Sequence, residues 1–253
     1  MQVQASSIGY AVPRGDFDAA IQSVFDTAVN LKPADQAGLI TLFTSERHDL
    51  PQGIRLDSKG INFKHLQVGD RAACRAGILH LPSLNISLHG ARPWRCDLSS
   101  LNIDIKKPEI KAAWETVFEA LDARQVCKNA ELRACDIFQG ADTTSALGRK
   151  LDPALQALVT ATRRFDLPAA GSAAKTMIGL GPGVTPSGDD VLLGYLAALW
   201  STLAGQLERL SFLSSFSAAI MLLTVLTNEI SRTYLLHAIQ GQFSSSLVAL
   251  VEA

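Results

Sequence analysis

The spacing of apolar positions along this chain changes near residue 107. Before it, short apolar runs alternate with turn-forming residues, a pattern typical of strands. After it, apolar residues recur at helical spacing, as at Ile110, Trp114 and Leu121. The change predicts an α+β protein with an N-terminal β-rich barrel or sandwich over residues 1–107 and a helical domain over residues 108–253.

The N-terminal region contains several segments that we expect to be strands. One turn-like stretch, Asp57-Ser58-Lys59-Gly60, has the composition of a hairpin and should join the strands on either side of it. The region 17–31 fits a helix or strands, and its Val and Phe content favours strands. The expected strands lie within residues 17–31, 38–44, 54–56, 61–63, 78–81, 84–88 and 101–105.

The C-terminal region predicts a series of helices separated by short breaks. Asp152-Pro153 offers a cap followed by a proline at the first helical position. The stretch 167–171, with its Pro and Gly, is expected to interrupt the chain. The expected helices lie within residues 109–128, 152–164, 191–204, 212–224, 228–240 and 244–252.

Residues 179–190, GLGPGVTPSGDD, form the most distinctive stretch of the chain. Glycines let a backbone turn through positive φ and approach a ligand closely. Thr185 followed by Pro186 predicts an N-cap and a first helical residue. A loop of this kind at a helix start can bind an anion through free N–H groups, with Gly181, Gly183, Thr185 and Ser187 as candidate ligands.

A purely structural interpretation of the glycine-rich loop stays open. Such turns commonly precede helices, and the stretch lacks both the Lys-Ser/Thr ending of a P-loop and the third glycine of a dinucleotide-binding loop. The carboxylate pair Asp189 and Asp190 favours a functional site. Successive helical residues point about 100° apart, so we expect one aspartate to bond backbone amides and the other to face a ligand. Both are candidate catalytic residues.

A second polar constellation lies in TNEISRTYLLHAIQGQFSSSL, residues 227–247. Thr227, Ser231 and Tyr234 fall at helical spacing and should share one face, although such hydroxyls often bond only to the preceding turn. We expect Thr227, Ser231 and Arg232 to contribute to substrate binding, and Gly241 to end the helix.

The stretch GLGPGVTPSGDD followed by LLGYL resembles the signature of a bacterial family long catalogued as a domain of unknown function. That family includes the third, small subunit of oxamate carbamoyltransferase from allantoin degradation, a part of purine catabolism. SRTYLLHAIQGQFSSSL is similar to its second motif, and SVFDTAVNL, GLITLF and LPQGIRL are similar to its N-terminal β segment. The resemblance implies phosphorolysis of oxalurate to oxamate and carbamoyl phosphate by an assembly of different subunits.

The composition limits which partners the chain is expected to bind and in which compartment it is expected to function. Hydrophobic residues make up 47% of the chain and the net charge is −1, which gives no case for nucleic acid or an anionic membrane surface. The stretch 210–228 is uncharged but contains five Ser/Thr before Leu226, so a buried helix is favoured over a membrane span. The four cysteines, without metal-binding spacing, and the absence of an apolar leader at the N-terminus predict a reduced cytoplasmic protein.

The signature carries two carboxylates and no cation, although carbamoyl phosphate is an anion that calls for several. Lys175, just before the signature, and Arg232, in the second motif, are the candidate cations. We therefore expect a chain that needs no resident cofactor, binds a small anionic substrate, and is inactive until partner subunits complete the site. Two alternatives remain: a phosphotransferase that uses Asp189, Asp190 and Mg²⁺, and a non-catalytic subunit that senses an anion or aids assembly.

Overall fold

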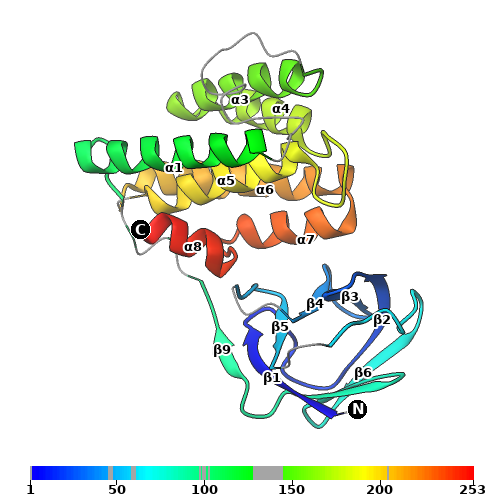
Figure 1. Ribbon diagram of the computed structural model, residues 1–253. Coiled ribbons are helices and arrows are strands. Elements are labelled where there is room, and N and C mark those ends of the chain that lie inside the picture. The colour runs from blue at the N-terminus through cyan, green and yellow to red at the C-terminus, as the bar shows by residue number, and fades with distance from the viewer. Residues whose placement is uncertain are drawn as a thin grey trace. The chain divides into compact units, whose positions relative to one another are not determined.

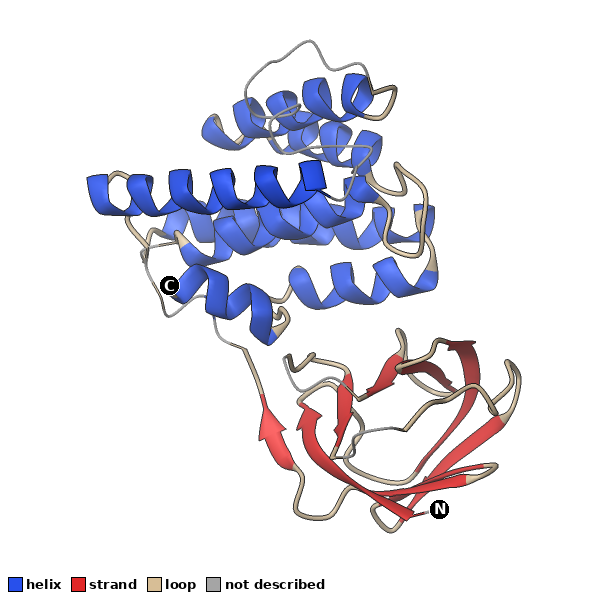
Figure 2. Ribbon diagram, viewed as in Figure 1, coloured by secondary structure: helices blue, strands red, loops and turns tan. Residues whose placement is uncertain are grey.

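The computed structural model describes residues 2–44, 48–57, 61–96, 98, 101, 103–127, 145–203 and 205–253. Strands occupy the N-terminal part and helices the C-terminal part, which confirms the α+β prediction (Figure 2). The strands are β1 (Gln2–Gly9), β2 (Phe17–Val24), β3 (Ala28–Pro33), β4 (Ile40–Phe43), β5 (Gly53–Leu56), β6 (Arg71–Arg75), β7 (Ile78–Leu81), β8 (Leu84–Ser87) and β9 (Arg92–Trp94).

Eight of these strands close into a barrel. Their order is β5-β4-β3-β2-β6-β7-β8-β1, and β1 also pairs with β5, so no edge remains among the eight (Figure 1). β9 runs parallel to β1 and pairs with its last residues, with Ser7 opposite Arg92. Of the two expected architectures, a barrel or a sandwich, the barrel is therefore correct.

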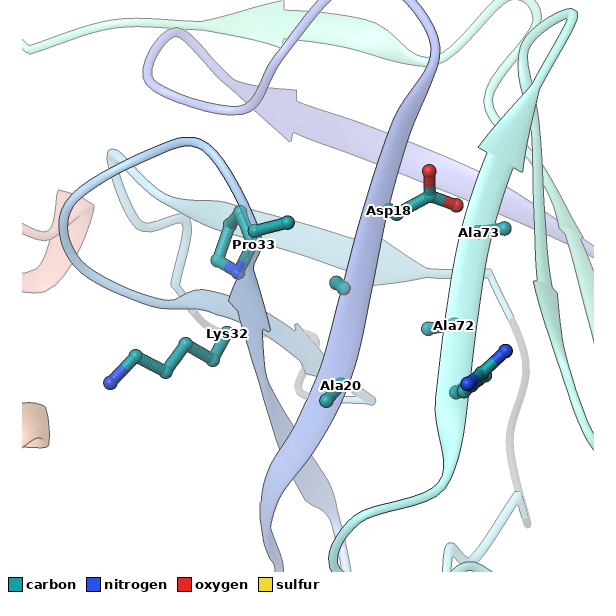
Figure 3. Close-up of a pocket in the computed structure, with 9 residues that line it drawn as sticks. Asp18, Ala20, Lys32, Pro33, Ala72 and Ala73 are labelled. Carbon is teal, nitrogen blue, oxygen red and sulfur yellow. The ribbon is translucent and has the colours of Figure 1, made fainter.

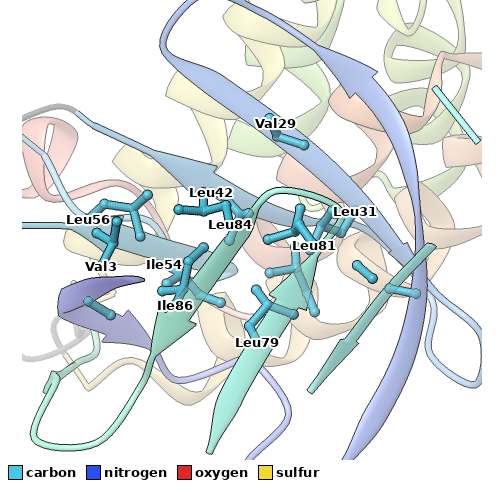
Figure 4. Packing of buried hydrophobic residues seen from close by; sticks show 14 of the residues in the cluster. Val3, Val29, Leu31, Leu42, Ile54, Leu56, Leu79, Leu81, Leu84 and Ile86 are labelled. Carbon is cyan, nitrogen blue, oxygen red and sulfur yellow. The ribbon is translucent and has the colours of Figure 1, made fainter. Parts of the chain in front are cut away.

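The barrel interior is filled by aliphatic side chains from all around the sheet (Figure 4). Alternation along the strands decides which side chains point inward: in β7, Leu79 and Leu81 are buried whereas His80 is exposed. The residues that are fully buried at the centre include Val29, Leu31, Leu42, Ile54, Leu79 and Ile86.

Two expected strands are absent, for different reasons. Residues 61–63 do not form a strand. The expected hairpin between 54–56 and 61–63 is therefore wrong, because β5 pairs with β1 and β4 instead. Ile61 and Phe63 are apolar because they fill the barrel core as part of a loop. The stretch 101–105 is also not a strand: the N–H of Ile103 donates to the carbonyl of Ser201 at the end of a helix. Residues 58–60 and 102 lie outside the described residues.

The helical part follows the expected series with shifted ends. The stretch 167–171, expected to interrupt the chain, instead begins a helix, because Asp166 caps it by accepting from the N–H of Ala169 and Pro168 lies in the first turn. The helices are α1 (Pro108–Cys127), α3 (Gly148–Arg163), α4 (Leu167–Met177), α5 (Ser187–Ser201), α6 (Leu207–Leu223), the 3₁₀ helix η2 (Thr224–Leu226), α7 (Glu229–Ala238) and α8 (Ser245–Glu252).

The chain divides into two compact units that differ from the expected domains 1–107 and 108–253. One unit combines Met1–Leu98 with Arg232–Ala253, and the other is Ser99–Ser231. The C-terminal segment joins the barrel through specific bonds: the N–H of Leu39 donates to Thr233 Oγ1 at 3.0 Å, and the N–H of Ser245 donates to the carbonyl of Asp49 at 2.9 Å. Periodicity marks helices, but these bonds decide which unit a helix belongs to.

The uncharged stretch within α6 and η2 is only partly a core helix. Leu207–Leu226 is the one described segment long and apolar enough to span a membrane, on length and composition alone, and about a third of it is buried. Its buried side packs Phe212, Phe216 and Ile220 into the helical unit. The expectation of a buried helix therefore holds for one face, while the other exposes large apolar side chains.

Candidate functional site: a glycine-rich loop at the start of α5

The glycine-rich stretch forms a loop between α4 and α5, within the Ser99–Ser231 unit. Gly179, Gly181 and Gly183 have φ values of 75°, 115° and 97°, in the left-handed region that favours glycine. At Gly181 the backbone also passes close to the helix start, since an added Cβ would lie 3.0 Å from the amide nitrogen of Ser187. Both properties explain why glycine is needed at residue 181.

The start of α5 is fixed against the end of α4. The N–H of Leu180 donates to the Met177 carbonyl at 3.0 Å, and the N–H of Gly188 donates to the Leu180 carbonyl at 2.8 Å. A Cβ on Gly188 would lie 2.0 Å from the Met177 carbonyl oxygen, so only glycine permits this packing. The loop is therefore held at both ends by backbone contacts.

The helix cap differs by one residue from the sequence prediction. Pro186, not Thr185, is the N-cap, and α5 begins at Ser187. The Pro186 carbonyl accepts from the N–H groups of Asp189 and Asp190 at 2.9 and 3.1 Å. The Thr185 side chain is hydrogen-bonded to Asp190 instead, and so does not cap the helix backbone.

Several N–H groups of the loop have no acceptor within the described part of the chain. They belong to Gly181, Gly183, Val184, Thr185 and Ser187. Hydrogen-bonding groups that find no partner in the protein must be satisfied by water or by a ligand. At the N-terminus of a 15-residue helix such groups are well suited to a negatively charged ligand.

Asp189 is directed into the protein. Its side chain is buried, with 2% of the residue exposed. Oδ1 accepts from the N–H of Gly179 at 2.8 Å, and Oδ2 accepts from Thr227 Oγ1 at 2.5 Å. This carboxylate therefore joins three segments: the beginning of the loop, the start of α5 and the junction before α7.

Asp190 lies on the exposed side of the same helical turn. Partial burial of its carboxylate by the surrounding loop raises its pKa from 3.8 to about 6; the hydrogen bond with Thr185 acts against this shift, and the charge of Asp189 adds to it. Adjacent aspartates thus have different surroundings, and one of them titrates close to neutral pH.

The second motif is divided between the two units. Thr227 precedes α7, whose start is capped by Asn228 Oδ1 accepting from the N–H groups of Ile230 and Ser231, so the expected shared helical face with Ser231 is wrong. The Ser231 hydroxyl is buried without a hydrogen-bond partner among the described residues, as is Arg232 Nε. Ser231 closes the helical unit, whereas Arg232 belongs to the unit of the barrel.

Gly241 ends the second motif's helix as expected. Its φ is 74°, its N–H donates to the Ala238 carbonyl, and the N–H of Gln242 donates to the His237 carbonyl. This pair of bonds is a Schellman motif, which satisfies carbonyls at the helix end. It directs the chain toward α8.

Sequence reasoning missed a charged cluster around the buried carboxylate of Asp49 in the unit of the barrel. Asp49 accepts hydrogen bonds from Ser7 and from Arg92, the latter at 2.7 Å, and forms an ion pair with Arg55 at 3.4 Å. The N–H of Asp49 also donates to Ser245 Oγ at 2.7 Å. These residues come from five separate segments, so no local pattern signals them; the cluster fixes the start of α8 to the barrel.

A shallow groove of about 550 Å³ lies on the outer face of β2, β3 and β6 (Figure 3). Its floor is lined by small side chains such as Ala20 and Ala73, with Lys32 and Arg71 beside Ala20 on the neighbouring strands. Asp18, at its rim, is paired with Arg75. The groove belongs to the barrel and contains none of the residues expected to form the site.

The described residues do not assemble a site for metal or redox chemistry. No group of three or more His, Cys, Asp or Glu side chains among them could hold a metal ion. Cys74 and Cys96 are buried free thiols. The side chain of Cys127 and all of Cys135 lie outside the described residues.

The fold and site define a two-unit α+β protein with a β-barrel and a glycine-rich loop at a helix start. A family model described as oxamate carbamoyltransferase subunit AllH matches residues 177–253, which include the whole of this loop and the second motif. A second model, the AllH family N-terminal domain, matches residues 4–93. The chain belongs to the AllH family. No solved structure matches it.

Proposed function

We propose that this chain is a subunit of a carbamoyltransferase that acts on oxalurate and phosphate, in allantoin degradation. Membership of a family named for an oxamate carbamoyltransferase subunit supports the proposal. In the reaction a phosphate oxygen bonds to the carbamoyl carbon of oxalurate and the carbon–nitrogen bond breaks. The phosphate proton passes to the leaving nitrogen, which gives oxamate and carbamoyl phosphate.

The observation that carries the proposal is the set of N–H groups at the start of α5 that find no acceptor among the described residues. Gly181, Gly183, Thr185 and Ser187 would donate to oxygens of phosphate or of the tetrahedral centre that forms during transfer. Donors fixed in advance stabilise developing negative charge better than water does, since they need not reorient. The loop's glycines allow the ligand to reach the backbone.

The two aspartates would have separate tasks. Asp189 is a positioning residue, because both its oxygens are bonded to Gly179 and Thr227 and hold the loop in shape. Asp190 is the candidate proton carrier: a carboxylate with a pKa of about 6 can accept the phosphate proton and return it to the leaving nitrogen. Both oxygens of Asp189 are bonded within the protein, so Mg²⁺ bound through one carboxylate and waters would have to use Asp190 alone, and the phosphotransferase alternative that uses both aspartates is less well supported.

Charge indicates that the chain supplies only part of the site. No ion pair joins Asp189 or Asp190 to a lysine or arginine among the described residues. A helix terminus offsets a charge by only about 0.3–1 kcal/mol when exposed. Partner subunits would therefore supply the cations. Buried free thiols at Cys74 and Cys96 are consistent with the reducing cytoplasm, where we place the assembly.

Reconstitution tests the proposal. The purified chain is incubated with oxalurate and phosphate, alone and with the other purified subunits of the enzyme, and oxamate and carbamoyl phosphate are measured. We expect turnover only in the mixture, and a large loss when Asp190→Asn replaces the wild type. Full turnover by the chain alone, with or without Mg²⁺, would contradict the shared site. A reconstituted enzyme unaffected by substitutions in the loop would favour the assembly-subunit alternative.

A further inference from the structure

The end of α6 and the 3₁₀ helix η2 expose a set of large apolar side chains. Met221, Leu222, Val225 and Leu226 are each half exposed or more, and Leu222 and Val225 reach 74% and 66%. We call these four residues the α6-end surface. Contiguous apolar side chains on a soluble protein mark sites where another molecule binds.

This surface is directly continuous with the glycine-rich loop, inside one compact unit. A Cβ on Gly179 would lie 2.7 Å from the carbonyl oxygen of Leu226, so the two backbones touch. The next residue, Thr227, donates to Asp189. A molecule seated on the α6-end surface would therefore lie beside the start of α5.

We infer that the α6-end surface is the docking site of another subunit of the carbamoyltransferase, one that presents apolar side chains bordered by arginine or lysine. The inference rests on the proposed function. Asp190, an exposed residue, carries its carboxylate at the helix start beside amides suited to an anion, and the described residues bring no cation to either aspartate. Charge complementarity thus selects a basic partner.

Two other occupants fit less well. Membrane-surface segments carry lysine and arginine around their apolar face, whereas residues 210–228 have no charge at all. The opposite side of α6 is also packed into the helical unit through Phe212, Phe216 and Ile220. A second copy of this chain would bring two exposed Asp190 carboxylates to one interface, where like charges repel.

The test compares two variants on the same helix. Leu222→Gln with Val225→Gln removes apolar contacts from the α6-end surface, while Leu207→Gln changes a side chain that is 81% exposed near the other end of α6. Each protein is mixed with the other purified subunits, and complex formation is followed by light scattering after gel filtration. We expect the double variant to bind at least about ten-fold more weakly and Leu207→Gln to bind like wild type. Thermal unfolding of the isolated chains should be unchanged.

The outcomes separate this inference from the proposed function. A double variant that assembles like wild type would overturn the docking surface and leave the function standing. A wild-type chain that binds no other subunit would overturn the proposed function and this inference with it. Loss of a homodimer, or of binding to phosphatidylcholine–phosphatidylglycerol vesicles, in the double variant without loss of subunit binding would assign the surface to those occupants instead.

Discussion

Thr227 and Asp189, 38 residues apart in the chain, are joined by a hydrogen bond of 2.5 Å from the threonine hydroxyl to the buried carboxylate. The same carboxylate accepts from the N–H of Gly179. One side chain thereby connects the glycine-rich loop, the start of α5 and the segment leading into the second motif. This bond therefore ties the glycine-rich stretch to the residue at which the second polar constellation begins, within the Ser99–Ser231 unit.

Removing the threonine hydroxyl should destabilise the chain. Thr227→Val leaves one oxygen of a buried carboxylate without its donor, which typically costs about 1–3 kcal/mol. Urea denaturation measures the free energy of unfolding. Thr176→Val is the matched control, since its hydroxyl bonds only to the Ser172 carbonyl one turn earlier on an exposed face of α4. Equal effects of the two substitutions would show that the bond to Asp189 is unimportant.

The two aspartates should separate stability from activity. Asp189→Ala removes acceptors from Gly179 and Thr227 and should lower the free energy of unfolding by about 1–3 kcal/mol. Asp190→Asn should not lower the free energy of unfolding at pH 7, because a pKa raised to about 6 means that the folded state disfavours the charged carboxylate. In the reconstituted enzyme Asp190→Asn should reduce the rate about 100-fold or more. Two variants with the same stability and activity profiles would refute the division.

Phosphate or sulfate should bind at the loop amides, and a side chain on Gly181 should prevent it. Gly181→Ala and Gly183→Ala both place a residue with a Cβ at positive φ, but only the former brings it within 3.0 Å of the Ser187 amide nitrogen. We expect titration calorimetry to show phosphate binding lost in Gly181→Ala or Gly181→Val and weakened only slightly in Gly183→Ala. Gly194→Ala, in open space on α5, controls for changes to the helix. Equal binding by all variants would exclude the loop.

Acidification should destabilise the chain through His237. Burial lowers the pKa of its imidazole from 6.5 to about 4, so between these values the unfolded state binds more protons than the folded state. Stability is then full above about pH 6.5 and falls as the pH drops toward 4, by up to about 3 kcal/mol. Thermal unfolding of wild type and of His237→Gln across this pH range measures the loss of stability on acidification, which should be absent in the variant. A parallel pH dependence in both proteins would assign the acid sensitivity to other groups.

The sequence by itself predicted the elements whose signal is local. Val and Phe content favoured the strands within 17–31, and helical spacing after residue 107 identified α1, α3 and α6 with shifted ends. Adjacent helical positions also predicted that Asp189 and Asp190 would have different surroundings, since neighbouring side chains on a helix point in different directions. The positive φ values expected in the glycine-rich loop occur at Gly179, Gly181 and Gly183.

Only the tertiary structure decided the relationships that join distant segments. Ile61 and Phe63 have the apolarity of a strand but fill the barrel core from a loop, because burial and strand pairing select the same side chains. Asp189 rather than Asp190 is the buried aspartate because Gly179 and Thr227 place their donors on its side of the helix. The C-terminal segment joins the barrel because Leu39 and Asp49 bond to it. Periodicity records which face of an element is apolar, whereas the partner of that face is set by the packing of the whole chain.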